Sequence, residues 1–198
     1  MEAVLLVLNS GHVLITKMNF TYILLISKKK DPQAMTNYHP ISLSNVVNRM
    51  VSKVLANRVK GILPNIISNA QIAFIPDRLI TDNTTVAYDM LHRLRNRRQG
   101  KVGHMAIKLD ISKAYDQVEW EFLWNIMLKM GFSAIWVDLA MQGVSSSSYS
   151  VLINGEPHDF ISPSRGIKQG DPLSPYMFLF CVDNLSTLLR KAIEAKQV

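Results

Sequence analysis

The pattern of apolar and polar positions divides the chain into short β-rich runs and longer helical runs. Runs rich in β-branched and aromatic residues predict strands at Asn19–Lys30, Tyr38–Leu43 and Met105–Leu109. The first run is apolar almost throughout, so we expect a buried strand, and three lysines close it. Asp31–Pro32 then turns the chain toward the second run.

A tight hairpin is predicted later in the chain, between Ser150–Ile153 and His158–Ile161. The residues between these runs include Asn154–Gly155, and both of them tolerate positive φ. Pro157 lacks a backbone donor, so it limits the returning strand to the edge of a sheet.

Apolar positions at helical spacing predict three long helices: Ser44–Leu63, Val118–Met130 and Pro175–Ala195. Pro64 stops the first pattern, Gly131 ends the second and Ser174 caps the third. The expected buried face of the last helix consists of Met177, Cys181, Leu185, Leu188 and Ala192. The alternation of strands and helices predicts an α/β (α+β) fold, with a small antiparallel sheet carrying Asp110 packed on these helices.

The first residues contain a short apolar run, Ala3–Leu8. We expect it to form a short helix that ends near Asn9–Gly11, because it is too short to span a membrane. It lacks a basic n-region and a small-residue cleavage site. These features predict an intracellular protein, nuclear or cytoplasmic, that is not secreted.

The composition is that of a globular protein with one domain. Of its 198 residues, 48% are hydrophobic and 19% charged, which excludes a disordered chain. The net charge of +7 favours a polyanionic partner. Cys181 is the single cysteine, which excludes disulfides and a cysteine metal site, and we expect it to be a small buried hydrophobic residue.

Several basic residues are candidates for contact with a nucleic-acid backbone. Arg49, Lys53 and Lys60 cluster on the polar face of the first long helix, where they form either a phosphate-tracking stripe or an ordinary solvated face. Arg58 falls within the apolar face, so an internal partner is expected. The basic cluster His92–Lys101 is expected to be an exposed loop.

Chemistry concentrates in Lys108–Trp120, with the sequence KLDISKAYDQVEW. Asp110 stands where the predicted strand stops, and Asp116 precedes a helix. A carboxylate at such a junction can hold a hard cation such as Mg²⁺. The alternative is that Asp110 merely ends the strand and Asp116 caps the helix.

This segment resembles the first catalytic-aspartate motif of reverse transcriptases, specifically those of plant non-LTR (LINE-type) retrotransposons. Ser164–Phe178, with the sequence SRGIKQGDPLSPYMF, resembles the Gln-Gly motif of the same family and lies at a matching distance downstream. The similarity extends from about Asn9 to Ala192. It implies a partial right-hand polymerase fold, with fingers at about 14–102 and palm, including an interleaved fingers segment, at about 103–198.

The resemblance also implies roles for individual residues. Asp110 and the backbone carbonyl of Ile111 would bind two Mg²⁺ ions. Tyr115 would exclude a ribose 2′-hydroxyl beneath the incoming sugar. The other implied nucleotide-binding residues are Lys28, Arg165, Gln169 and Gly170, with further positive charge from Lys168. The implied partners are an RNA template, a DNA primer and deoxynucleoside triphosphates, and no membrane.

Three positions depart from the family pattern. His39 replaces an arginine that grips the triphosphate, and His lacks the planar fork of Arg. Ser27 replaces a proline before Lys28. Asp77 replaces a glycine in Gln71–Asn83, the segment that shapes the template path and contributes Arg78 as a candidate contact. A glycine there indicates a turn with unusual φ and ψ.

The family's Asp-Asp hairpin, which supplies the remaining metal carboxylates, has no counterpart, because the sequence contains no Asp-Asp pair. Nor does the sequence contain the family's thumb, an endonuclease or an RNase H domain. The chain is therefore expected to be a reverse transcriptase fragment that is inactive alone. A non-catalytic remnant that binds nucleic acid or a partner is the alternative, and a product without function is a third.

Overall fold

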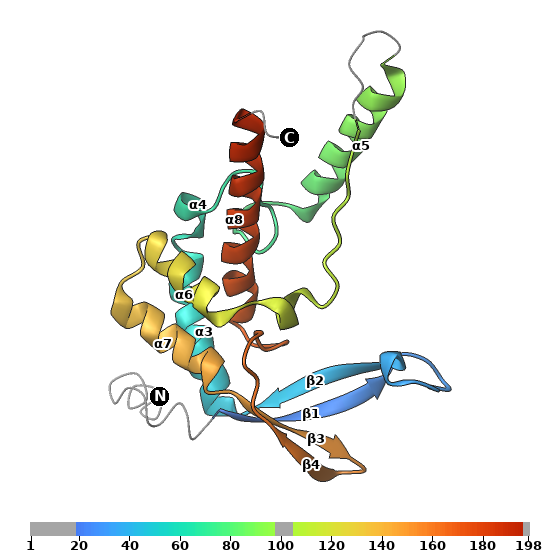
Figure 1. Ribbon diagram of the computed structural model, residues 1–198, viewed down its shortest axis with the longest axis vertical. Coiled ribbons are helices and arrows are strands. Elements are labelled where there is room, and N and C mark those ends of the chain that lie inside the picture. Colours follow the sequence, from blue (N-terminus) through green and yellow to red (C-terminus); the bar gives the residue numbers. More distant parts are fainter. Residues whose placement is uncertain (1–18, 98–104, 196–198) are drawn as a thin grey trace.

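The computed structural model describes residues 19–97 and 105–195, in which a four-stranded sheet lies at one end of a group of helices (Figure 1). The strands are β1 (Phe20–Ser27), β2 (Tyr38–Ser44), β3 (Ser148–Ile153) and β4 (Glu156–Ile161). Their order is β2-β1-β3-β4. The two hairpins, β1–β2 and β3–β4, are antiparallel, and they join through a parallel pairing of β1 with β3.

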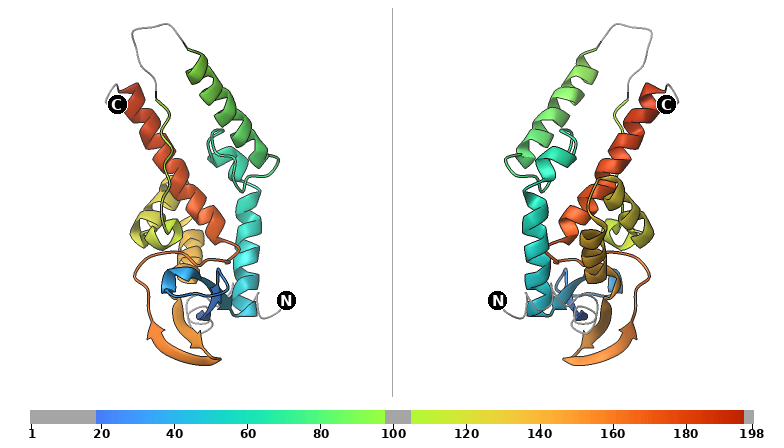
Figure 2. Two further views of the ribbon diagram at one scale, coloured as in Figure 1. Left: turned by 90° about the vertical axis from the view of Figure 1, so that its right-hand side faces the viewer. Right: turned by 90° about the vertical axis from the view of Figure 1, so that its left-hand side faces the viewer.

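The hydrophobic core lies among helices and not under the sheet. The helices are α3 (Val46–Lys60), α4 (Leu63–Ile66), α5 (Ile80–Asn96), α6 (Trp120–Lys129), α7 (Ala134–Ser145) and α8 (Ser174–Glu194), with short 3₁₀ turns at η1 (Met35–Asn37) and η2 (Ala114–Gln117). The largest buried apolar side chains come from this group: Val59, Leu63, Leu123, Met127, Val137, Met177 and Phe180. In Figure 2, α3 and α8 diverge away from the sheet, and α5 lies beyond α3 on the same side of the molecule.

The predicted α/β class is confirmed, and both hairpins are where the sequence places them. Asn154 and Gly155 have φ of 54° and 87°, as the turn requires, and Pro157 lies in the edge strand β4. Two details of the predicted sheet are wrong. It is not all antiparallel, and β1 is not a buried strand, because Tyr22, Leu24 and Ile26 are exposed.

Met105–Leu109 is not a strand, so Asp110 does not stand at the end of one. Residues 105–111 have no assigned secondary structure and are exposed. A strand needs a neighbour for its backbone hydrogen bonds, and none of the described residues pairs with this segment. The β-rich sequence is therefore not matched by a partner within the described chain.

The helix bounds are confirmed within a few residues. The predicted cap of the last helix is wrong, because Leu173 is the N-cap residue and Ser174 lies within α8. The buried faces also differ from those that the helical wheels indicate. In α3 the buried positions include the polar Asn48 and Ser52, whereas Arg58 is exposed and the expectation of an internal partner is wrong.

Pro64 follows the end of α3, as predicted, and it also lies in the first turn of α4. Its missing N–H costs nothing there, because the first N–H groups of a helix have no partner within the helix. The helix α7 was not predicted.

The faces of α8 and α5 are more exposed than the sequence indicates. Met177 is buried and Cys181 partly so, but Leu185 and Leu188 are 39% and 55% exposed, because no described segment covers that half of α8. No residue of α5 is buried. His92–Asn96 belong to this helix and not to a loop, and 98–101 lie outside the described residues.

The predicted N-terminal helix also lies outside the described residues. Among the helices that are described, none has the length and apolar character to cross a membrane.

Candidate functional site

The two motif segments lie directly against each other. The backbone N–H of Gly166 donates to the carbonyl of Val118 at 2.8 Å, and that of Ile167 donates to the carbonyl of Tyr115 at 3.0 Å. Trp120 Nε1 donates to the carbonyl of Gly166 at 2.7 Å. Two backbone hydrogen bonds and one side-chain hydrogen bond thus join segments that are about fifty residues apart in the sequence.

Gly166 is the residue that permits this approach. Its φ is +90°, and a Cβ at this position would lie 3.3 Å from Asp116 Cα. Any other residue would face both an unfavourable backbone conformation and a tight contact with backbone atoms, which would have to shift by a few tenths of an ångström. At the surface of the contact, Arg165 Nη1 pairs with Glu119 Oε1 at 3.2 Å.

Tyr115 faces the start of α8 from this contact. Its ring centroid is 5.0 Å from that of Phe178, and its partial burial raises the pKa of the phenol. The side chain therefore remains neutral and presents an aromatic surface at the motif junction.

Downstream of the contact, Lys168 is buried whereas Gln169 and Gly170 are exposed. Gly170 has φ of +85°, which forms a turn between them and α8. The Lys168 ammonium donates to Asn19 Oδ1 and to Thr21 Oγ1, at 2.9 Å for the latter. The ammonium group therefore has polar partners within the protein.

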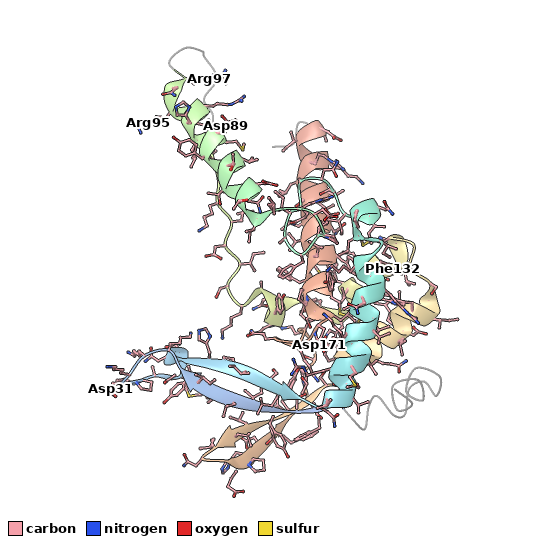
Figure 3. All side chains as sticks on the ribbon, turned by 180° about the vertical axis from the view of Figure 1, so that it is seen from behind. Asp31, Asp89, Arg95, Arg97, Phe132 and Asp171 are labelled. Atoms are coloured by element: carbon pink, nitrogen blue, oxygen red, sulfur yellow. The ribbon has the colours of Figure 1, made fainter. Side chains whose placement is uncertain are left out.

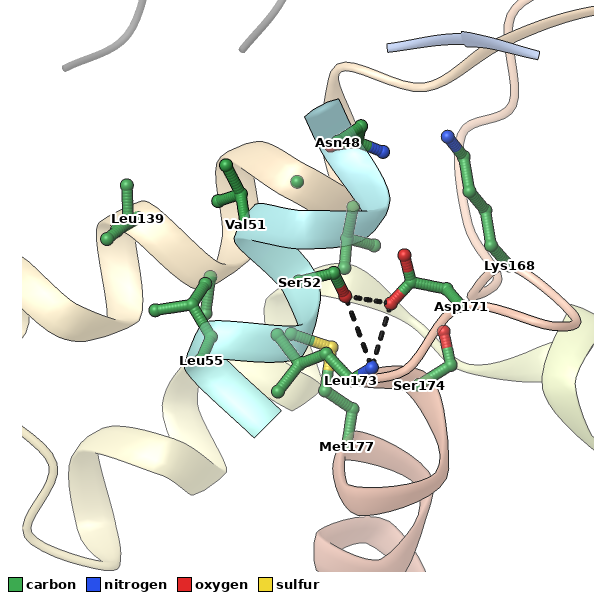
Figure 4. A pocket seen from close by; sticks show the side chains of 13 residues that line it. Asn48, Val51, Ser52, Leu55, Leu139, Lys168, Asp171, Leu173, Ser174 and Met177 are labelled. Carbon is green, nitrogen blue, oxygen red and sulfur yellow. Dashed lines mark hydrogen bonds between the residues drawn. The ribbon is translucent and has the colours of Figure 1, made fainter. Parts of the chain in front are cut away.

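The next aspartate, Asp171, binds within the fold. Its carboxylate accepts from Ser52 Oγ of α3 and, at 2.9 Å, from the backbone N–H of Leu173, the residue just before α8 (Figure 4). Asp183, farther along α8, accepts from the backbone N–H of Ser68 at 3.1 Å. Both carboxylates therefore have structural partners.

Asp110 and Ile111 lie in the exposed segment that precedes η2. The described residues contain no group of three or more His, Cys, Asp or Glu side chains placed to hold a metal ion. One carboxylate and one carbonyl cannot supply the oxygen ligands of two Mg²⁺ ions. The residues that the structure describes therefore do not fit the two-ion site on their own.

A cleft of about 250 Å³ separates the β1–β2 hairpin from the Gln-Gly turn. Its lining comes from the sheet, through Ile23, Ser42 and Tyr149, and from the turn, through Arg165 and Gln169. The structure thus brings Arg165 and Gln169 together with the sheet in one concave surface.

Lys28 is not one of the described residues that line this cleft. It follows the end of β1, where its Nζ donates to the carbonyl of Thr36 at 2.9 Å. Asp31 marks the outer end of the same hairpin in Figure 3. His39 is exposed in β2 and is paired with Ile26.

The backbone at Asp77 has a positive φ of +63°, so the unusual conformation that the family's glycine indicates at this position is confirmed. The neighbouring Arg78 stabilises the loop that contains it. Its Nη1 donates to the carbonyl of Ser68 at 2.7 Å and also to the carbonyl of Gln71. A contact of Arg78 with nucleic acid stays a prediction, and the guanidinium already has these partners.

The predicted basic stripe on α3 is exposed at all three positions, Arg49, Lys53 and Lys60. On α5, Arg95 and Arg97 lie near its far end, away from the sheet (Figure 3). Asp89 pairs with Arg93 at 3.0 Å on the same helix.

The sequence gives no sign that Asn19 and Thr21 are buried. Both are fully buried polar residues at the start of β1, and Asn48 on the apolar side of α3 contacts the first of them. For Asn48 the sequence did contain a signal of burial, because this polar residue falls within the apolar face of a predicted helix. Nothing in the sequence identifies Asn19 as its hydrogen-bond partner.

Comparison with known proteins places this site in a family. Residues 26–198 match the family model described as reverse transcriptase (RNA-dependent DNA polymerase). A Xenopus laevis protein, the transposon TX1 uncharacterized 149 kDa protein, is 30% identical over 85% of this chain. The retrovirus-related Pol polyprotein of the type-2 retrotransposable element R2DM from Drosophila melanogaster is 29% identical over 84%.

A third match is an uncharacterized Arabidopsis thaliana mitochondrial protein, 56% identical over 22% of this chain and 35% of its own length. The chain spans only 13% and 15% of the lengths of the TX1 and R2DM proteins. The family match covers most of the chain, including both motif segments that the fold brings together. The chain therefore belongs to the reverse transcriptase (RNA-dependent DNA polymerase) family.

Proposed function

We propose that the chain is the fingers and part of the palm of a plant non-LTR retrotransposon reverse transcriptase. The domain would add deoxynucleotides to a DNA primer under the direction of an RNA template. The observation that carries this proposal is the direct contact between the two motif segments, through Gly166 and Ile167 on one side and Tyr115 and Val118 on the other. The Arabidopsis match supports the plant origin.

Each candidate residue has a proposed role within this domain. Asp110 and the carbonyl of Ile111 would hold metal in a protein that supplies further carboxylates. Tyr115 would set the preference for deoxynucleotides, because its ring would occupy the space beneath the incoming sugar. Gln169 and Gly170 would contact the nucleotide, and their exposure at a fixed turn supports this role.

Charged residues would hold the phosphates. Arg165 lines the cleft beside Gln169, which supports its assignment to the triphosphate. Lys28 would reach the nucleotide from the hairpin. The exposed stripe of Arg49, Lys53 and Lys60, with Arg78, would follow the template or primer backbone.

The isolated chain is expected to show no primer extension with Mg²⁺ or Mn²⁺. Phosphoryl transfer depends on metal positioning and charge stabilisation, and the described residues do not supply the ligands for two ions. The measurement is extension of a labelled DNA primer on an RNA template. Steady incorporation by the chain alone, lost in Asp110→Asn, would contradict the claim that its catalytic centre is incomplete.

A longer protein that carries the same motifs and the Asp-Asp hairpin is the positive control. It should extend the primer, and Asp110→Asn should abolish extension. In that protein His39→Arg and Asp77→Gly should improve nucleotide use if these departures are defects.

The alternative function is non-catalytic binding of nucleic acid or of a partner. The exposed basic stripe on α3 favours it. Binding through dispersed Lys and Arg would be weak, non-specific and steeply dependent on salt. A longer protein that binds the primer-template in this way and still fails to extend it would favour this alternative.

A further inference from the structure

Lys168 is a lysine buried among neutral acceptors. It is 5% exposed, and its Nζ donates to Thr21 Oγ1 at 2.9 Å, to Asn19 Oδ1, and at 3.5 Å to the Asn19 carbonyl. Burying an ammonium group costs free energy, which neutral hydrogen bonds offset only in part. Packing alone therefore does not account for a charge at this position.

Asn19 connects this lysine to two helices. It is fully buried. Its Nδ2 faces the Gly143 carbonyl at 2.8 Å, Ser146 Oγ at 2.9 Å and Ser147 Oγ at 3.2 Å, all at the end of α7. Its Oδ1 also accepts from Asn48 Nδ2 of α3 at 2.8 Å. Because this cluster joins β1, α3 and α7, we call Asn19, Thr21, Asn48 and Lys168 the Asn19 cluster.

The segment that contains Lys168 is fixed on both sides. Gly166 and Ile167 bind the first motif segment, and Asp171 binds α3 and the start of α8. Figure 4 shows Lys168 beside Asp171 on the same loop. Between these attachments Gln169 and Gly170 are exposed and form no hydrogen bond with the described residues.

We propose that Lys168 is a positioning residue, which attaches the Gln169–Gly170 turn to the base of the β1–β2 hairpin and so sets the turn against the cleft. The sheet and the segment 165–169, which includes Lys168 itself, supply most of the lining of that cleft, and Asp116 also lines it. A link between the sheet and this segment fixes the cleft's geometry before a ligand binds, which lowers the ordering cost of binding. The inference rests on the proposed nucleotide role of the turn.

The sharpest test is the pair Thr21→Val and Thr21→Ser. Val has the shape of Thr but cannot accept from the ammonium, whereas Ser keeps the hydroxyl. The measurements on the isolated chain are the NMR order parameter of the Gly170 N–H, which reports how rigidly the turn is held, and the affinity for dATP. We expect Thr21→Val to lower this order parameter and to weaken dATP binding about tenfold, and Thr21→Ser to leave both close to wild type.

Lys168→Met is a second test of the same link. The matched control is Lys129→Met, which makes the same substitution at an exposed lysine. Lys168→Met should have an effect at least as large as that of Thr21→Val, because it also removes the hydrogen bonds to Asn19. The double variant should be no worse than Lys168→Met alone, since the Thr21 bond is already lost in Lys168→Met. Lys129→Met should change neither measurement.

The pH profile separates positioning from simple support of the fold. Burial lowers the pKa of Lys168 to about 8, against an attraction to Asp171 that raises it. The other group facing the ammonium is the Tyr149 ring, at 5.8 Å, whose pKa is raised, so it stays neutral. Affinity for dATP should fall above pH 8 in the wild type and remain flat in Lys168→Met.

The outcomes are distinct. An unchanged Gly170 order parameter and unchanged dATP affinity in a folded Thr21→Val variant would overturn the proposal, even if Lys168→Met fails to fold. A lowered Gly170 order parameter in Thr21→Val, in a chain whose wild type binds no dATP, would keep the positioning role and refute the proposed nucleotide site.

Discussion

Lys168 carries its charge at neutral pH although its side chain is almost wholly buried. Its pKa is lowered to about 8 from an ordinary 10.5. Between these values the unfolded chain binds more protons than the folded chain, so the contribution of Lys168 to stability rises with pH. Cys181 has the opposite effect, because burial raises the pKa of its thiol to about 11 and stability is lost as the pH rises from 9.

A comparison with Lys168→Met isolates the lysine from the other titrating groups. We expect the difference in unfolding free energy, wild type minus Lys168→Met, to increase by about 1–2 kcal/mol between pH 7.5 and 9.5. Urea denaturation at the two pH values measures it. A difference that stays constant would mean that the folded and unfolded states hold this proton equally.

Single residues also mark the limit of prediction from sequence. The positive φ at Asp77 was predictable, because the family has a glycine at this position. The positive φ at Asn154 and Gly155 was also predictable, because an Asn-Gly pair between two strands is typical of a tight hairpin. The Asn19 cluster was not predictable. Its members are polar residues far apart in sequence, and their burial follows only from the packing of three elements.

Among the elements, the contact between the motif segments depends on one glycine. Gly166→Ala should destabilise the fold by about 1–2 kcal/mol, because φ of +90° is unfavourable for alanine and its Cβ would meet Asp116. Gly143→Ala is the matched control within α7, where a Cβ has no atom within 4 Å and alanine should stabilise by about 0.5–1 kcal/mol. Unfolding free energies decide, and effects of the same sign would contradict this account.

The elements also explain which predictions failed. Periodicity correctly located α3, α6 and α8, but it could not tell which faces find a neighbour. Met105–Leu109 has the composition of a strand without a partner among the described residues, and the far half of α8 has apolar residues without a cover. Composition indicates the capacity to pair or pack, whereas the outcome depends on segments elsewhere.

At the scale of the whole molecule, a helical core and a sheet meet at a polar junction. The buried apolar side chains belong to the helical part and its loops, while the buried polar residues Asn19, Thr21, Asn48 and Lys168 lie where the sheet attaches. Hydrogen bonds are directional, so such a junction fixes orientation more strictly than an apolar contact of the same size. This arrangement suits a cleft whose two walls belong to different parts.

The parallel pairing of β1 with β3 has a consequence for the order of folding. The β1–β2 hairpin is local in sequence. The sheet can be completed only after β3 has been synthesised, because Phe20 pairs with Ser148. At typical synthesis rates this interval is on the order of 10 s, during which one edge of β1 has no partner. In refolding, amides of the β1–β2 pairing should gain protection from exchange before those that join β1 to β3. Simultaneous protection would show instead that the sheet forms in one step.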